Sequence, residues 1–215
     1  MTKYKTEQEN FWAGEFGSDY IDRNQSAQLM ASNLDYFSKS LKLANNINSI
    51  IEFGANIGMN IRALKLLRPN VNFSAIEINE DAVKMLQDLI GPENTYCESI
   101  LDFIPKEKSD LVLIKGVLIH INPDSLDALY QTIYDASKKY ILIGEYYNPA
   151  PVTIPYRGHE DRLFKRDFAG DILNKFSDVK LIDYGFAYKN DPSYPQDDIT
   201  WFLLEKASDI EIKKC

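Results

Sequence analysis

The sequence predicts an α/β fold in which a mostly parallel, seven-stranded, doubly wound sheet ends in an antiparallel hairpin. Three observations predict it. Strand-like and helix-like segments alternate along most of the chain, a glycine turn joins the first such pair, and a short connection joins the last two strands. Alternation of this kind places helices on both faces of a parallel sheet.

The predicted elements follow an N-terminal helical cap, expected over residues 1–45. In that cap, Met30, Leu34, Phe37 and Leu41 recur at helical spacing within residues 24–42. Runs of apolar and β-branched residues predict strands at 49–53, 72–78, 95–100, 110–115, 139–147, 179–188 and 198–206. Helical spacing or capping signals predict helices at 58–67, 81–89, 124–136 and 166–176.

Two segments are expected to lie outside the regular pattern. Residues 148–155 contain three prolines, which lack the backbone N–H that a ladder or a helix needs. We therefore predict a loop over residues 148–167, on the side of the sheet where ligands bind. We expect residues 1–207 to form one domain and residues 208–215 to be a frayed tail.

Composition excludes several classes of function. The chain of 215 residues has a formal net charge of −8, which argues against binding to nucleic acid or to an anionic membrane surface. No signal peptide or membrane-spanning run is visible, so a cytoplasmic protein is expected. Cys97 and Cys215 lie in unlike contexts, which predicts free thiols, and no cluster of metal ligands is evident.

The glycine turn lies within "SIIEFGANIGMNIRAL", residues 49–64. It differs from a dinucleotide fingerprint because Asn56 and Met59 stand where the second and third glycines would be. The pattern E-F-G-x-x-x-G instead resembles the first motif of class I S-adenosylmethionine-dependent methyltransferases, which have a Rossmann-like fold. The resemblance implies that Gly54, Ala55 and Asn56 lie under the amino-acid part of that cofactor, while Gly58 permits close helix packing.

A carboxylate supports this interpretation. Glu77 ends the next strand, 23 residues after Gly54, about where a doubly wound fold that binds a nucleoside places the group that accepts hydrogen bonds from ribose hydroxyls. The alternative is that Glu77 only precedes the helix that follows Asn79. The neighbouring Ile78 is included in the predicted cofactor site.

Two later segments extend the resemblance to such methyltransferases. It implies that Ser99 and Ile100 face the adenine; Ser99 stands where an aspartate is frequent, so backbone groups are expected to recognise the base. Lys115 and Gly116 would lie beside the sulfonium. An N-terminal segment would close over the cofactor with Trp12 or Tyr20 and with Arg23 on the methionyl carboxylate, although the aromatic residues there are equally expected to form a hydrophobic plug.

The N-terminal segment and the stretch 144–168 together resemble methyltransferases associated with pseudaminic acid biosynthesis. This resemblance implies a sugar-acid or nucleotide-sugar substrate in bacterial surface glycan assembly. An arginine fork grips carboxylate or phosphate well, and a charged island follows the prolines. The predicted substrate-binding residues are therefore Tyr146, Asn148, Tyr156, Arg157, His159 and Arg162. The alternative is a solvated, self-paired charge run.

The predicted reaction is in-line methyl transfer to a nitrogen or oxygen of the substrate. A hydroxyl acceptor needs a base, for which His159 is the first candidate, followed by Tyr147 and Glu145. His120 ends an apolar run and is expected more often to be structural than catalytic. The competing hypotheses are a cofactor-binding scaffold without catalysis and, with less support, a nicotinamide-dependent sugar oxidoreductase. The oligomeric state and the acceptor atom stay open.

Overall fold

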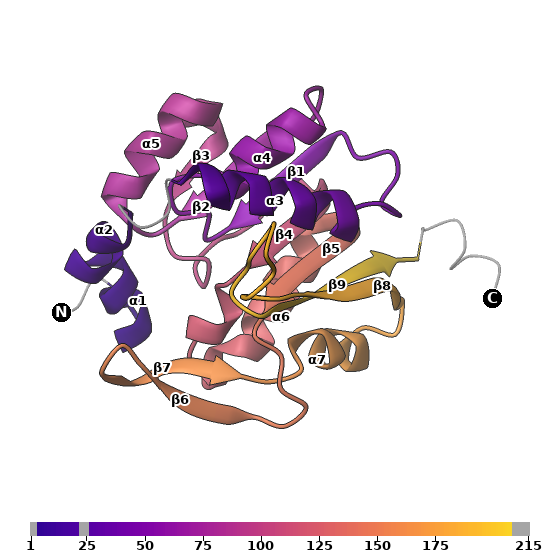
Figure 1. The fold of residues 1–215 in the computed structure, drawn as a ribbon. Coiled ribbons are helices and arrows are strands. Elements are labelled where there is room, and N and C mark those ends of the chain that lie inside the picture. The colour runs from indigo at the N-terminus through magenta and orange to yellow at the C-terminus, as the bar shows by residue number, and fades with distance from the viewer. Residues whose placement is uncertain (1–3, 22–25, 208–215) are drawn as a thin grey trace.

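The computed structural model describes residues 4–21 and 26–207 of the chain, except for the side chains of residues 159 and 160. Its seven-stranded sheet has the order β3-β2-β1-β4-β5-β9-β8 (Figure 1). The first five of these strands are parallel, and β9 is antiparallel to both of its neighbours. The predicted fold class is therefore confirmed. The strands are β1 (Ser49–Phe53), β2 (Asn72–Glu77), β3 (Thr95–Cys97), β4 (Ser109–Lys115), β5 (Ser137–Glu145), β8 (Val179–Ala187) and β9 (Ile199–Lys206).

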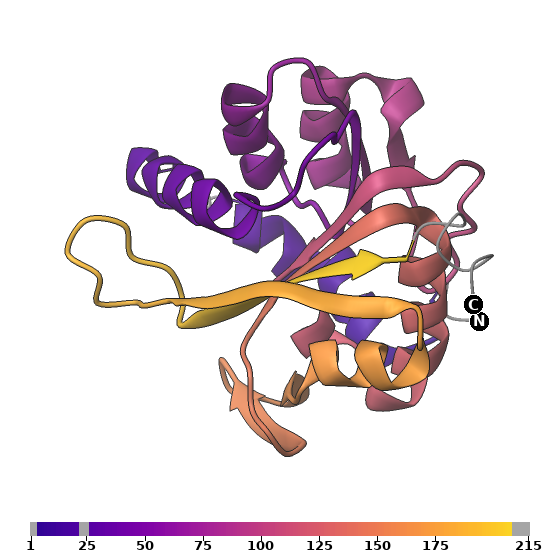
Figure 2. The ribbon, with the colours of Figure 1, turned by 90° about the vertical axis from the view of Figure 1, so that its right-hand side faces the viewer.

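Helices cover both faces of the sheet (Figure 2). The side chains of α3, α4 and α5 contribute to one buried cluster, and those of α6 and α7 contribute to another. These helices are α3 (Ala27–Ser40), α4 (Met59–Leu67), α5 (Glu80–Ile90), α6 (Leu126–Ala136) and α7 (Phe168–Lys175).

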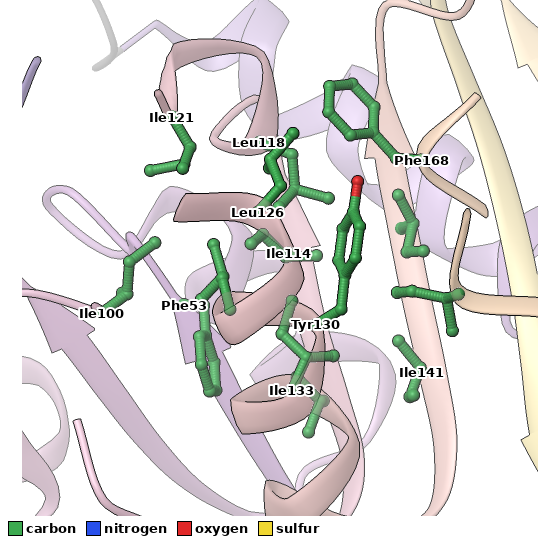
Figure 3. Packing of buried hydrophobic residues seen from close by; sticks show 14 of the residues in the cluster. Phe53, Ile100, Ile114, Leu118, Ile121, Leu126, Tyr130, Ile133, Ile141 and Phe168 are labelled. Atoms are coloured by element: carbon green, nitrogen blue, oxygen red, sulfur yellow. The ribbon is translucent and has the colours of Figure 1, made fainter. Parts of the chain in front are cut away.

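Successive residues of the strands β4, β5 and β9 enter the two clusters in turn, as the period of a strand requires. Leu111 and Leu113 of β4 pack on the α3–α4 side, whereas Val112 and Ile114 pack on the α6–α7 side. Figure 3 shows the second cluster, where the phenol of Tyr130 and the ring of Phe168 lie beside aliphatic side chains.

Short capping interactions set several helix ends. Asn122 accepts a hydrogen bond from the N–H of Asp124 and is followed by Pro123, so this Asn-Pro pair begins the 3₁₀ turn η4 (Pro123–Ser125) ahead of α6. Asp167 accepts from the N–H of Gly170, which explains why α7 begins at Phe168 rather than at the predicted residue 166.

The prediction of a loop over residues 148–167 is wrong. This stretch contains a separate antiparallel hairpin of β6 (Val152–Tyr156) and β7 (His159–Lys165). Pro155 is tolerated because the pairing register shifts between Ile154 and Tyr156, so the proline needs no ladder hydrogen bond. In Figure 1 the hairpin lies below the sheet and beside two short helices, α1 (Glu7–Ala13) and α2 (Glu15–Ile21).

Candidate functional site

The glycine turn follows β1 and has an unusual backbone. Gly54, Asn56 and Gly58 have φ angles of 70°, 48° and 78°, a left-handed region in which glycine is unstrained and asparagine is better tolerated than most residues. A Cβ atom on Gly54 would lie 2.6 Å from a methyl carbon of Val117. The turn therefore passes closely under the segment that follows β4.

Glu77 ends β2 and binds this turn directly. Its Oε2 accepts a hydrogen bond from the N–H of Asn56 at 2.7 Å, and its Oε1 accepts from the N–H of Asn79 at 2.8 Å. Burial raises the pKa of Glu77, although these backbone N–H groups oppose the rise. Each carboxylate oxygen has a further lone pair, so the group retains the capacity to accept from a ligand.

The turn and Glu77 open onto a cavity of about 240 Å³ at the carboxyl ends of the parallel strands. Ligands of open α/β sheets bind at this edge. The structure brings together on the cavity wall most of the residues predicted for a cofactor and two predicted for a substrate, namely Trp12, Tyr20, Gly54, Ala55, Asn56, Glu77, Ile78, Ser99, Ile100, Lys115, Gly116, Tyr146 and Tyr156.

Other predicted residues lie away from the wall. Gly58 precedes α4 and faces the side chains of Leu86 and Leu89, in keeping with a packing role. Tyr147 is 42% exposed, with its ring 5.9 Å from that of Phe202. The amide of Asn148 donates to the carbonyl of Ala150, within its own segment.

Arg157 and Arg162, the two predicted arginines that the structure describes, do not line the cavity. The exposed guanidinium of Arg157 lies 5.5 Å from the ring centroid of Tyr156. Arg162 pairs with Glu7 at 3.1 Å and thereby links the hairpin to α1. Arg23 and the side chain of His159 lie outside the described part of the chain.

Glu145, a predicted base, lies behind the wall. Its Oε1 accepts from the N–H groups of Val117 and Leu118, each at 2.9 Å, and so fixes the segment that follows β4. Burial raises the pKa of Glu145 to about 7, against the effect of these hydrogen bonds. This geometry makes Glu145 a positioning residue for the wall.

Lys115 ends β4 and forms a buried polar network at one end of the cavity. Its Nζ donates to Oε1 of Gln196 at 3.2 Å and to Oδ1 of Asn33 at 3.4 Å. Burial lowers the pKa of Lys115 to about 8. Nearby Glu52 accepts from Asn60 at 2.6 Å, and burial raises the pKa of this carboxyl to about 8. No local sequence pattern points to Gln196, which reaches the cavity from the connection between β8 and β9.

His120 lies on the wall within an aromatic cluster. Its ring centroid is 4.7 Å from that of Trp12 and 4.9 Å from that of Tyr156. Its Nδ1 is 2.6 Å from the carbonyl oxygen of Arg162, so Nδ1 carries the proton and Nε2 is the acceptor of a neutral ring. Burial lowers the pKa of His120 to about 4, although that hydrogen bond opposes the change.

Helix α1 supplies wall residues that the sequence analysis missed. Gln8 and Glu9 are 7% and 5% exposed, and both line the cavity with Trp12. Within the described residues, Oε1 of Gln8, Oε1 of Glu9 and Nε1 of Trp12 are buried without a hydrogen-bond partner. The pattern Thr6-x-x-Glu9 is a capping-box signal for a helix start, but it does not reveal where that helix docks.

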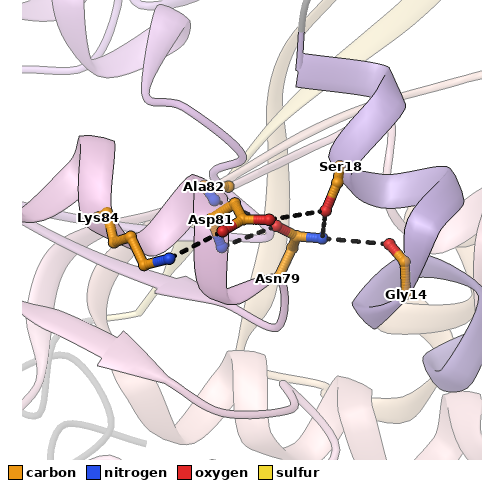
Figure 4. Close-up of polar contacts among 6 residues, drawn as sticks. All are labelled: Gly14, Ser18, Asn79, Asp81, Ala82 and Lys84. Atoms are coloured by element: carbon orange, nitrogen blue, oxygen red, sulfur yellow. Dashed lines mark hydrogen bonds and ion pairs between the residues drawn. The ribbon is translucent and has the colours of Figure 1, made fainter.

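Asn79 holds the two N-terminal helices against the sheet (Figure 4). Its Oδ1 caps α5 by accepting from the N–H groups of Asp81 and Ala82. Its Nδ2 donates to Oγ of Ser18 at 3.2 Å and to the carbonyl of Gly14 at 3.4 Å. One side chain therefore ties the end of β2, beside Glu77, to the helices that cover the cavity.

The described residues include no cluster of metal ligands and no membrane-spanning helix. No group of three or more His, Cys, Asp or Glu side chains there is arranged to hold a metal ion. No helix in the described ranges is long and apolar enough to cross a bilayer.

The comparisons show which known proteins share this fold. No protein-family model and no curated protein sequence matches the chain. Among solved structures, the mitomycin 7-O-methyltransferase has a TM-score of 0.66 at 13% identity; the match covers 94% of this chain and only 61% of that protein's length.

Two further enzymes match over nearly their whole length. The Burkholderia thailandensis 1,6-didemethyltoxoflavin-N1-methyltransferase has a TM-score of 0.72 at 11% identity, covering 97% of this chain and 94% of that one. The magnesium protoporphyrin IX methyltransferase of Synechocystis has a TM-score of 0.62 at 10% identity, covering 96% and 100%. The chain has the class I methyltransferase fold.

Proposed function

We propose that this chain is an S-adenosylmethionine-dependent methyltransferase that acts on a small molecule. One observation carries the proposal: the left-handed turn at Gly54–Gly58, with Glu77 bonded to it, opens onto a cavity at the carboxyl edge of a sheet that methyltransferases share. The structures of two such neighbours contain S-adenosylhomocysteine or S-adenosylmethionine.

The residues of this cavity suit a nucleoside with a charged amino-acid tail. Glu77 offers carboxylate lone pairs for two vicinal hydroxyls. Oδ1 of Asn56 and Oε1 of Glu9 are buried acceptors without a partner in the described structure, and such atoms need donors from a ligand or water. Lys115 and its amide neighbours provide a polar end for the tail.

When bound, S-adenosylmethionine supplies a methyl group whose bond to sulfur breaks as a bond to the acceptor atom forms, and the acceptor then loses one proton. The chain excludes water with the rings of Trp12, Tyr20, Tyr146 and Tyr156. Nε2 of His120 is a neutral hydrogen-bond acceptor on the wall that would orient the hydroxyl of a substrate, and its pKa of about 4 makes it a weak base. Glu145 positions the wall, while His159 and Tyr147 remain predictions as alternative bases.

Isothermal titration calorimetry tests cofactor choice. The proposal requires binding of S-adenosylmethionine and S-adenosylhomocysteine and no binding of NAD. Binding of NAD alone would favour the oxidoreductase hypothesis. The scaffold hypothesis predicts cofactor binding without any methylated product when the chain is incubated with labelled cofactor and a pool of small molecules analysed by mass spectrometry.

A sugar-acid or nucleotide-sugar acceptor of the pseudaminic acid type is a finer proposal that depends on the sequence resemblance alone. Arg157 and Arg162 were expected to grip its anionic group, yet Arg162 pairs with Glu7 and Arg157 stacks near Tyr156. The hypothesis therefore requires Arg162 to exchange Glu7 for the substrate. A nucleotide-sugar fraction in the same mass-spectrometric screen tests it, and methylation confined to other fractions would exclude it.

A further inference from the structure

Helix α1 carries a carboxylate whose two oxygens have different tasks. Oε2 of Glu9 accepts hydrogen bonds from the N–H of Thr6 at 2.7 Å and from its hydroxyl at 2.9 Å, which completes the capping box. Oε1 is buried at the cavity wall and has no partner in the described structure. A buried acceptor without a donor is costly, so this oxygen needs a donor from water or from a ligand that fills the cavity.

An ion pair brings the residue before the capping box of α1 close to the segment that follows β3. Lys5, four residues before Glu9, forms an ion pair with Asp102, and Asp102 follows closely on the wall residues Ser99 and Ile100. The hydroxyl oxygen of Ser99 accepts from the N–H of Leu101 at 3.1 Å, so its own proton is available to a ligand acceptor. The wall of this one cavity therefore offers a ligand both a donor hydroxyl and a carboxylate oxygen.

We propose, on the basis of the methyltransferase function above, that Oε1 of Glu9 accepts a hydrogen bond from the exocyclic amine of the bound adenine. In an adenine nucleoside the exocyclic amine is the only N–H donor of the base, because the glycosidic nitrogen carries no hydrogen and the other ring nitrogens are acceptors. A carboxylate at the nucleobase end can therefore pair only with that amine. Helix α1 thus acts as the element that distinguishes adenine from a 6-oxo purine, the role expected of backbone groups beside Ser99.

The substitution Glu9→Gln tests this because it keeps the oxygen that caps the helix and replaces the acceptor Oε1 with a hydrogen-bond donor. Glutamine also serves in a capping box, where its oxygen accepts from the N–H of Thr6. Its Nε2 then occupies the place of Oε1 and presents a donor to the cavity. The donor opposes the amine of adenine and suits the 6-oxo group of hypoxanthine.

Calorimetry with S-adenosylhomocysteine and S-inosylhomocysteine measures the preference directly, without catalysis. We expect the wild type to prefer the adenine compound and Glu9→Gln to lower that preference by about 10- to 100-fold. Glu7→Gln, an exposed change on the same helix, should keep the wild-type preference.

The outcomes separate the two proposals. Failure of the wild type to bind either compound would overturn the methyltransferase function. Wild-type binding with the same preference in Glu9→Gln would overturn the role of Glu9 alone. If Glu9→Gln does not fold, Glu9→Ala takes its place and should lower the preference, whereas an unchanged preference would overturn the inference.

Discussion

Replacing Glu77 by alanine should weaken both the fold and cofactor binding. The carboxylate accepts hydrogen bonds from the N–H groups of Asn56 and Asn79 at 2.7 and 2.8 Å. Hydrogen bonds to charged groups contribute about 1.5–3 kcal/mol each, and water from the cavity partly replaces them, so we expect the free energy of unfolding to fall by about 2–4 kcal/mol. For a chain of this length the melting temperature should fall by about 5–15 °C.

The loss of ribose acceptors should weaken binding further. Loss of a charged acceptor for the two hydroxyls corresponds to about 2–3 kcal/mol, or about 30- to 150-fold in the Kd of S-adenosylhomocysteine. Calorimetry well below the melting temperature of the variant separates this effect from unfolding. Glu107→Ala, at an exposed site, is the matched control. A folded Glu77→Ala variant with wild-type affinity would refute the assignment of Glu77 to the ribose.

Three further predictions address single groups. Burial raises the pKa of Glu52 to about 8 from 4.5, so between these values the unfolded chain binds fewer protons and stability falls as pH rises. In urea unfolding, the free energy of unfolding of Glu52→Gln should rise relative to that of the wild type by at least about 1 kcal/mol between about pH 5 and pH 8. A difference between the two proteins that does not change with pH would contradict this. In NMR, His120 should show a pKa near 4, with the proton of its neutral ring on Nδ1. The variant His159→Ala assigns the signals of the other histidine. A pKa of His120 near 6.5 would show that the ring is hydrated. Gly54→Ala should lower the free energy of unfolding by about 2–4 kcal/mol because the new Cβ would lie 2.6 Å from a methyl of Val117. Gly116→Ala, with a similar φ and nothing within 4 Å of its Cβ, should lower it by only about 1 kcal/mol. Equal losses in thermal unfolding would contradict the role of the close approach.

The part of the site formed by strand ends was predictable because the carboxyl ends of parallel strands lie side by side. Once the alternation of strands and helices is recognised, Gly54 is expected just after one strand and Glu77 and Lys115 at the ends of its neighbours. The register of β1 with β2 and β4 agrees with this. No knowledge of long-range side-chain packing was needed for this part.

The remaining walls depend on docking that no local pattern contains. Glu9 reaches the cavity because α1 rests on Asn79 and on the hairpin, and Gln196 reaches it from a long connection between two strands. The proline-rich hairpin was mistaken for a loop because Pro155 falls at a shift in register, a feature that appears only when both strands are known. In each case the signal is a contact between segments distant in sequence.

Asn79 links two sides of the candidate site, the end of β2 and the N-terminal helices. Its N–H donates to Glu77, its Oδ1 begins α5, and its Nδ2 reaches Ser18 and Gly14 in the N-terminal helices. A ligand that bonds to Glu77 therefore orders the residue on which α1 rests, and a ligand that bonds to Glu9 holds α1 against that same residue. If both proposed contacts form, each should lower the entropic cost of the other, and we expect the end of β2 and a helix more than 60 residues earlier in the chain to bind the nucleoside cooperatively.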